Sequence, residues 1–207
     1  MTDVVDPTLE DSDLDRFVHG RYLLRKKFFR VFGDDFSIFD EEDRLAFYCR
    51  LKALRLREDI RVFADRAQTR ELLAIKARTV LDFGTTYDVT DSVSGEPVGS
   101  LRRKGFKSMM RDEWAILGAE GQEMGTIRED SLGKAIARRI IGDISFFMPQ
   151  AYHATIGEVE VATFRQRFNP LIAKIDFDFS MDHGLLLDRR LGVAAGLLLG
   201  AIEGRQD

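Results

Sequence analysis

Six basic residues in two nearby segments have the types and spacing that suit anion binding. They are Lys76, Arg78, Arg102, Arg103, Lys104 and Lys107. If the two segments form neighbouring strands, the six side chains make a ridge of cations, called the basic ridge below. Each cation near an anionic membrane surface adds about 1 kcal/mol of attraction for phosphate groups. The alternative is a set of scattered surface charges that pair with the 35 acidic residues.

The sequence contains no complete catalytic motif among those we searched for. Residues 131–134 spell the S-x-x-K of serine acylases, but the companion S-D-N and K-T-G motifs are absent. Ser131 is better interpreted as the N-cap of a helix. There is also no G-x-S-x-G, P-loop or G-x-G-x-x-G motif. We therefore predict no catalytic residue and no cofactor, and a hydrolase with a dispersed site is kept only as a third hypothesis.

Metal ligands are equally sparse. The three histidines, His19, His153 and His183, occur in unrelated local contexts, so a site would need carboxylates brought in by the fold. The single cysteine, Cys49, excludes an intrachain disulfide and a cysteine-based zinc site. We predict no metal site.

Bulk composition predicts one globular domain. The 207 residues are 44% hydrophobic and 32% charged, which is ordinary for a compact domain. A net charge of -4 argues against general nucleic-acid binding. The first residues carry many acidic side chains and neither the basic nor the apolar region of a signal peptide. We expect a disordered acidic tail over 1–18, one domain over 19–207, and a cytoplasmic protein, peripheral at the membrane if its ligand is a lipid.

Several segments alternate apolar and polar side chains, which predicts half-buried strands. The clearest cover 45–51, 73–78 and 174–182. Cys49 lies on the apolar side of its segment, so we interpret it as a core residue. Asp176 and Asp178 share one strand face and could form a carboxylate pair, although a solvated face is the simpler interpretation. Shorter β-rich runs cover 60–64, 87–90, 114–117 and 156–161.

A repeated pattern connects these segments. A basic residue is followed nine or ten positions later by an aromatic one, in the pairs Lys27 and Phe36, Arg78 and Tyr87, Lys104 and Trp114, and Arg167 and Phe177. Four copies predict a meander of hairpins in which each strand pairs with the next. Closing such a sheet into a barrel hides its edges.

The C-terminal segment predicts a buried helix over 189–204. Residues 191–202 carry no charge, and glycines at 192, 196, 200 and 204 form one stripe. Twelve residues cover about 18 Å of helix, whereas a bilayer core is about 30 Å thick. We therefore expect no transmembrane span and a helix inside the protein. A second helix, basic and amphipathic, is expected over 131–147, either on a membrane surface or packed on the mouth of the barrel.

These elements predict a mainly β fold: a closed antiparallel β-barrel of about twelve strands around a buried hydrophobic C-terminal helix. The chain resembles the tubby C-terminal-like superfamily, which includes the phospholipid scramblases and the LURP-one-related proteins. The resemblance rests on YLLRKKFFRVFGDDFSIFDEEDRL, on LLAIKARTVLDFGTTYDVTD and on the terminal LLLDRRLGVAAGLLLGAIE. Residues 164–171 also look like the scramblase segment before the terminal helix.

The resemblance implies a binding module, because a basic barrel face of tubby proteins binds phosphoinositides. Two differences from the scramblases argue against scramblase activity in this chain. The segment that corresponds to their calcium-binding segment is basic here, as TFRQRFNP, and their cysteine-rich stretch is absent. Our leading hypothesis is a non-enzymatic module that binds anionic phospholipid or another phosphate-bearing ligand through the basic ridge. The alternative is a membrane-associated, scramblase-like protein whose last helix enters the bilayer.

Overall fold

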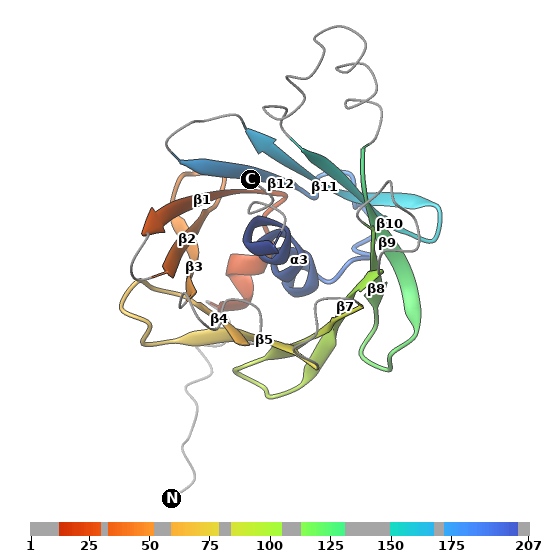
Figure 1. The fold of residues 1–207 in the computed structure, drawn as a ribbon, viewed down its shortest axis with the longest axis horizontal. Helices are drawn as coiled ribbons and strands as arrows, with labels where there is room; N and C mark the ends of the chain where they lie inside the picture. Colours follow the sequence, from red (N-terminus) through yellow and green to blue (C-terminus); the bar gives the residue numbers. More distant parts are fainter. Residues whose placement is uncertain are drawn as a thin grey trace, which may run out of the picture.

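Twelve antiparallel strands form one closed barrel around a central helix in the computed structural model (Figure 1). The structure describes residues 13–29, 33–51, 59–78, 84–104, 113–130, 150–167 and 172–202. The strands are β1 (Arg21–Phe29), β2 (Gly33–Phe39), β3 (Leu45–Leu51), β4 (Asp59–Phe63), β5 (Glu71–Ala77), β6 (Thr86–Asp91), β7 (Pro97–Lys104), β8 (Glu113–Leu117), β9 (Glu123–Glu129), β10 (Ala151–Ile156), β11 (Val159–Arg167) and β12 (Ala173–Asp178). Each strand pairs with the next, and β1 pairs with β12 to close the sheet. The predicted fold class is confirmed.

The hairpins of the repeated pattern are present as predicted. Its four copies correspond to β1–β2, β5–β6, β7–β8 and β11–β12. The prediction of one β-rich run over 156–161 is wrong, because Gly157 turns the chain between β10 and β11 with a φ of +56°. Glycine adopts this left-handed conformation readily, so a short turn interrupts residues that otherwise favour strands.

The two ends of the barrel differ in how much of them is described. The end at which the C-terminal helix begins, called the entry end below, carries the turns after β2, β4, β6, β8 and β10. The connections at the opposite end comprise 30–32, 52–58, 79–83, 105–112, 131–149 and 168–171, which lie outside the described residues. The expected amphipathic helix over 131–147 and the S-x-x-K segment therefore lie outside the described part of the chain.

The central helix α3 (Arg189–Ile202) fills the barrel, and all of its residues from Leu191 to Ile202 are buried (Figure 1). It lies against β12. A Cβ atom on Gly192 would lie 2.6 Å from Phe179 Cε1, and one on Gly196 would overlap the Phe177 ring. The glycine stripe therefore brings the helix backbone into direct contact with aromatic rings of the wall. Among the described residues, no helix is both long and apolar enough to cross a bilayer.

Ionic contacts hold both ends of α3. At its start, Asp188 Oδ1 accepts a hydrogen bond of 2.9 Å from the Arg190 backbone N–H, which is the geometry of an N-cap. Arg190 Nη1 also contacts Asp91 Oδ2 of β6 at 2.8 Å. Near the other end, Lys26 Nζ donates to the Gly200 carbonyl at 3.4 Å and lies 3.3 Å from Asp34 Oδ2. A cation near a helix C-terminus is favourable because the helix dipole is negative there.

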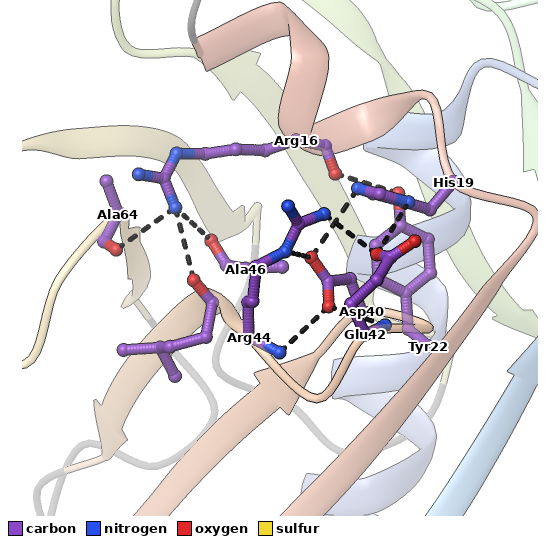
Figure 2. A network of polar contacts seen from close by, with 9 residues as sticks. Arg16, His19, Tyr22, Asp40, Glu42, Arg44, Ala46 and Ala64 are labelled. Atoms are coloured by element: carbon purple, nitrogen blue, oxygen red, sulfur yellow. Dashed lines mark hydrogen bonds and ion pairs between the residues drawn. The ribbon is translucent and has the colours of Figure 1, made fainter.

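An ordered N-terminal segment covers the entry end. The acidic tail was expected to extend to residue 18, but Asp15–Phe17 form the 3-10 helix η1, and Phe17 packs in the core with its ring centroid 4.7 Å from that of Phe47. Asp13 Oδ2 contacts Arg70 Nη2 at 2.5 Å. Arg16 Nη1 donates to three backbone carbonyls, those of Leu45, Ala46 and Ala64 (Figure 2). The chain is therefore packed on the barrel from Asp13 onward.

The glycine contacts predict unequal effects of two alanine substitutions. We expect Gly196→Ala to lower the free energy of unfolding by about 1–3 kcal/mol, because the new methyl group meets the Phe177 ring in a packed core. Gly200→Ala is the matched control, since its Cβ would lie 3.2 Å from Cδ1, the terminal methyl group of Ile175, and alanine favours helix over glycine by up to about 1 kcal/mol. Urea denaturation measures both. Equal or greater stability of Gly196→Ala relative to Gly200→Ala would contradict the packing.

Candidate functional site

The described residues of the basic ridge lie on strands β5 and β7 or directly after β5, and the two strands flank β6. Two strand spacings separate β5 from β7, or about 10 Å. Lys76 and Arg78 are exposed at the end of β5, and Arg102 and Lys104 lie on the outer face of β7. The structure therefore brings four of the six predicted residues to one outer surface.

The other two residues of the prediction are placed differently. Arg103 pairs in register with Trp114, whose side chain is only 1% exposed and belongs to the core. Residues opposite each other on neighbouring strands project from the same face of a sheet. Arg103 therefore projects from the inner face of β7, away from its two neighbours in sequence. Lys107 lies outside the described residues.

Carboxylates on the same outer surface pair with the ridge. Arg78 contacts Asp88 of β6 through two nitrogens at 2.7–3.0 Å. Arg102 contacts Glu123 of β9 at 2.9 Å. Lys104 bridges Glu113 at 3.0 Å and Glu123 at 2.9 Å. An incoming anion must therefore compete with carboxylates that already neutralise much of the charge.

These ion pairs shift the pKa values of Asp88, Glu123 and Lys104. Burial raises the pKa of Asp88, but hydrogen bonds from Arg78 and Ser100 outweigh it and hold that pKa below its ordinary value. The hydrogen bond from Lys104 lowers the pKa of Glu123. In turn, the hydrogen bonds from Glu123 and Glu113 raise the pKa of Lys104. The three directions favour the charged forms of Asp88, Glu123 and Lys104 at neutral pH.

A second group of cations lies side by side on the neighbouring strands β1, β12 and β11, where the sheet closes. Arg25 lies opposite Lys174, and Lys174 lies opposite Arg167, so three cations stand in one row on β1, β12 and β11. Arg25 contacts Asp43 at 2.6 Å and Arg167 contacts Asp176. Within the described part of the chain, Lys174 has no ion pair. Like charges directly opposite each other destabilise a sheet, so this row is unusual.

Sequence reasoning missed this row for a physical reason. Arg25 and Lys174 are about 150 positions apart, and only closure of the barrel makes them neighbours. The outward positions of each strand could be read from the alternation, but the register between β1 and β12 could not. Lys174 of this row and the exposed Arg165, which lies two positions before Arg167 on β11, carry the same kind of charge as the ridge and serve below as its matched control.

A polar cluster at the entry end joins the N-terminal segment to the β2–β3 turn (Figure 2). His19 Nε2 lies 3.6 Å from Asp40 Oδ2, and His19 Nδ1 lies 3.9 Å from Glu42 Oε2. Arg44 Nε donates to Asp40 Oδ2 at 2.9 Å, and Arg44 Nη2 donates to Glu42 Oε2 at 2.8 Å. One imidazole, two carboxylates and a guanidinium therefore meet on the surface.

The remaining candidates have structural explanations. Cys49 is 1% exposed, and burial raises the pKa of its thiol, which disfavours the nucleophilic thiolate. Asp176 and Asp178 form separate ion pairs, with Arg167 and Arg21 respectively, so the two carboxylates do not act as a catalytic dyad. A hollow between β10, β11, β12 and α3 has a volume of about 10 Å³, which is room for about one water molecule. It is far smaller than ordinary ligand pockets, which enclose roughly 300 Å³ or more.

Comparisons with known proteins agree with the architecture. A family model described as LURP-one-related matches residues 45–195, which is well over half of the chain. No curated protein and no solved structure matches the chain.

The contact between Arg78 and Asp88 predicts a measurable titration. The pKa of an aspartate in an unfolded chain is about 3.9. Because the folded pKa is lower, the pair stabilises the fold above that value, and its contribution is lost as the pH falls through the folded pKa. We expect the carboxyl midpoint of Asp88, followed by carbon-13 NMR, to lie below about 3.9 and to rise in Arg78→Gln. A midpoint that stays in place in the variant would mean that the pair does not form in solution.

Proposed function

Since the chain belongs to the LURP-one-related family of the tubby-like C-terminal superfamily, we propose that it is a non-enzymatic barrel module that binds an anionic phospholipid or another phosphate-bearing ligand. The basic ridge is the proposed binding surface. The family is generally non-catalytic, which favours binding over chemistry. We place the protein in the cytoplasm, at the membrane periphery when its ligand is a lipid.

The observation that carries the proposal is the convergence of four cations on one outer surface. Lys76, Arg78, Arg102 and Lys104 come from two strands that are separated only by β6. Lys76 is exposed, and among the described residues it has no ion pair. A ligand with two or more phosphate charges could bridge β5 and β7 at this spacing of about 10 Å.

The outer surface is a better candidate than the barrel interior, because α3 occupies the interior. The helix is buried along its length and touches the wall at Gly192 and Gly196. A ligand inside the barrel would have to displace it. An anion on the outer face has only to replace carboxylate partners such as Glu123, whose side chain is 41% exposed.

The scramblase-like alternative requires the last helix to enter lipid. In the structure, α3 is enclosed by the twelve strands (Figure 1). It is held by contacts of Lys26 and Arg190. Those contacts would have to break before the helix could leave. We therefore favour peripheral binding by the intact barrel.

Vesicle flotation tests the proposal with two opposite substitutions. Removing both cations in Arg102→Ala/Lys104→Ala should weaken binding to vesicles that contain anionic lipid by roughly thirtyfold, at about 1 kcal/mol for each cation. Glu123→Gln should strengthen binding several-fold, because it frees Arg102 and Lys104 from their shared carboxylate. Soluble inositol trisphosphate should compete if the headgroup alone is recognised.

The matched control is Arg165→Ala/Lys174→Ala, which removes two cations from the outer face of β11 and β12. These strands lie across the barrel from β7 (Figure 1). We expect this control to retain most of the binding. Equal loss in the two double variants would show that net charge rather than the ridge is recognised. Equal flotation with neutral and anionic vesicles would reject the proposal.

A further inference from the structure

We propose that His19, Asp40 and Glu42 form a surface site for a divalent transition metal, with Zn²⁺ as the best-suited ion. One ligand atom from each residue lies within 4.8 Å of the others. Zinc bonds to histidine nitrogen and carboxylate oxygen measure about 2.1 Å, which puts ligand atoms about 3.4 Å apart in a tetrahedral site. The 3.6 Å between His19 Nε2 and Asp40 Oδ2 is close to that spacing.

The fold holds the Asp40 carboxylate ready for an ion. Its side chain is only 6% exposed. Oδ1 accepts hydrogen bonds from the backbone N–H groups of Glu42 at 3.0 Å and Arg44 at 2.8 Å, so Oδ2 is directed toward His19 (Figure 2). A carboxylate that backbone hydrogen bonds fix in this way suits a metal ligand, because it needs little reorganisation when an ion binds.

Packing against Tyr22 holds the His19 imidazole in place, but the ring has no hydrogen bond to a described residue. The 3.6 Å and 3.9 Å contacts of its nitrogens are longer than hydrogen bonds, which rarely exceed about 3.2 Å. The edge of the ring packs against Tyr22, with centroids 5.9 Å apart. The Tyr22 hydroxyl in turn donates to the Arg16 carbonyl at 2.8 Å. A histidine held in this way favours zinc over calcium or magnesium, which prefer oxygen ligands alone.

When no metal ion is bound, the Arg44 guanidinium occupies the place between the two carboxylates. Its guanidinium bridges Asp40 and Glu42, the same two carboxylates that would bind the ion. The Arg44 side chain is 66% exposed and can turn into solvent, and that of Glu42 is 57% exposed and can rotate toward His19. A doubly charged ion would thus replace a singly charged group between the same carboxylates.

Metal binding would fasten the N-terminal segment to the barrel. His19 lies two positions before β1, whereas Asp40 and Glu42 belong to the β2–β3 turn. Three protein ligands leave one position for water. The site lies at the entry end, far along the strands from Lys104 at the opposite end of β7, so it is independent of the ridge.

The experiment uses the full chain, stripped with EDTA and dialysed, and titrated with ZnCl₂ against a chromophoric chelator. We expect saturable binding of one ion with a rise in thermal midpoint, and affinity at least tenfold weaker in His19→Asn. Arg44→Gln should bind more tightly, because it removes the competing cation.

His153→Asn is the matched control, because His153 is likewise a histidine beside a carboxylate, with Glu160 at 2.8 Å, but it does not belong to the group of three ligands. This variant should bind zinc like the unchanged chain. Thermal unfolding in EDTA verifies that His19→Asn is folded. Absence of saturable binding, equal loss in His153→Asn, or unchanged affinity in both His19→Asn and Arg44→Gln would overturn the proposal.

Discussion

The direct contact between the glycine face of α3 and two aromatic rings, Phe177 of β12 and Phe179 directly after it, is the constraint on which the rest of the structure depends. A barrel of twelve strands encloses more space than its own inward side chains fill, and a helix of ordinary side chains would be too wide to sit against Phe177 and Phe179. Gly192 and Gly196 remove that obstacle. The filled interior then allows β1 to meet β12 and close the sheet.

Ionic contacts fix where α3 lies along the barrel. Arg190 ties its start to Asp91 of β6, and Lys26 reaches from β1 to the carbonyl of Gly200. Lys26 is 1% exposed and lies beside Asp34, so two charges are held out of water. Breaking one partner of such a buried pair leaves an uncompensated charge, which costs about 3–5 kcal/mol. These contacts favour one depth of insertion over sliding.

Much of the fold could be predicted from the sequence because its signals are local. Strand alternation, the repeated hairpins and the apolar helix each lie within a short stretch of chain, and together they predict the closed barrel. Details that depend on long-range register could not be predicted. Arg103 turned out to lie on the inner face, opposite Trp114. His19 gave no metal signal because its carboxylate neighbours lie about twenty positions away, across the β1–β2 hairpin.

The boundary of the N-terminal tail was missed for a different reason. Acidic composition indicates a solvated segment, yet single residues can reverse that tendency. Asp13 meets Arg70, and Phe17 enters the core beside Phe47. Neither partner is close in sequence, so composition alone could not predict that the segment packs on the entry end.

Native-state hydrogen exchange tests most directly whether α3 is an integral part of the barrel core. If it is, the amides of α3 and of the closing strands β1 and β12 should exchange only through global unfolding, with one common free energy and the same dependence on denaturant. Exchange of the α3 amides at a lower free energy, while the strands remain protected, would show that the barrel stays closed without its helix and would contradict the central role assigned to this contact.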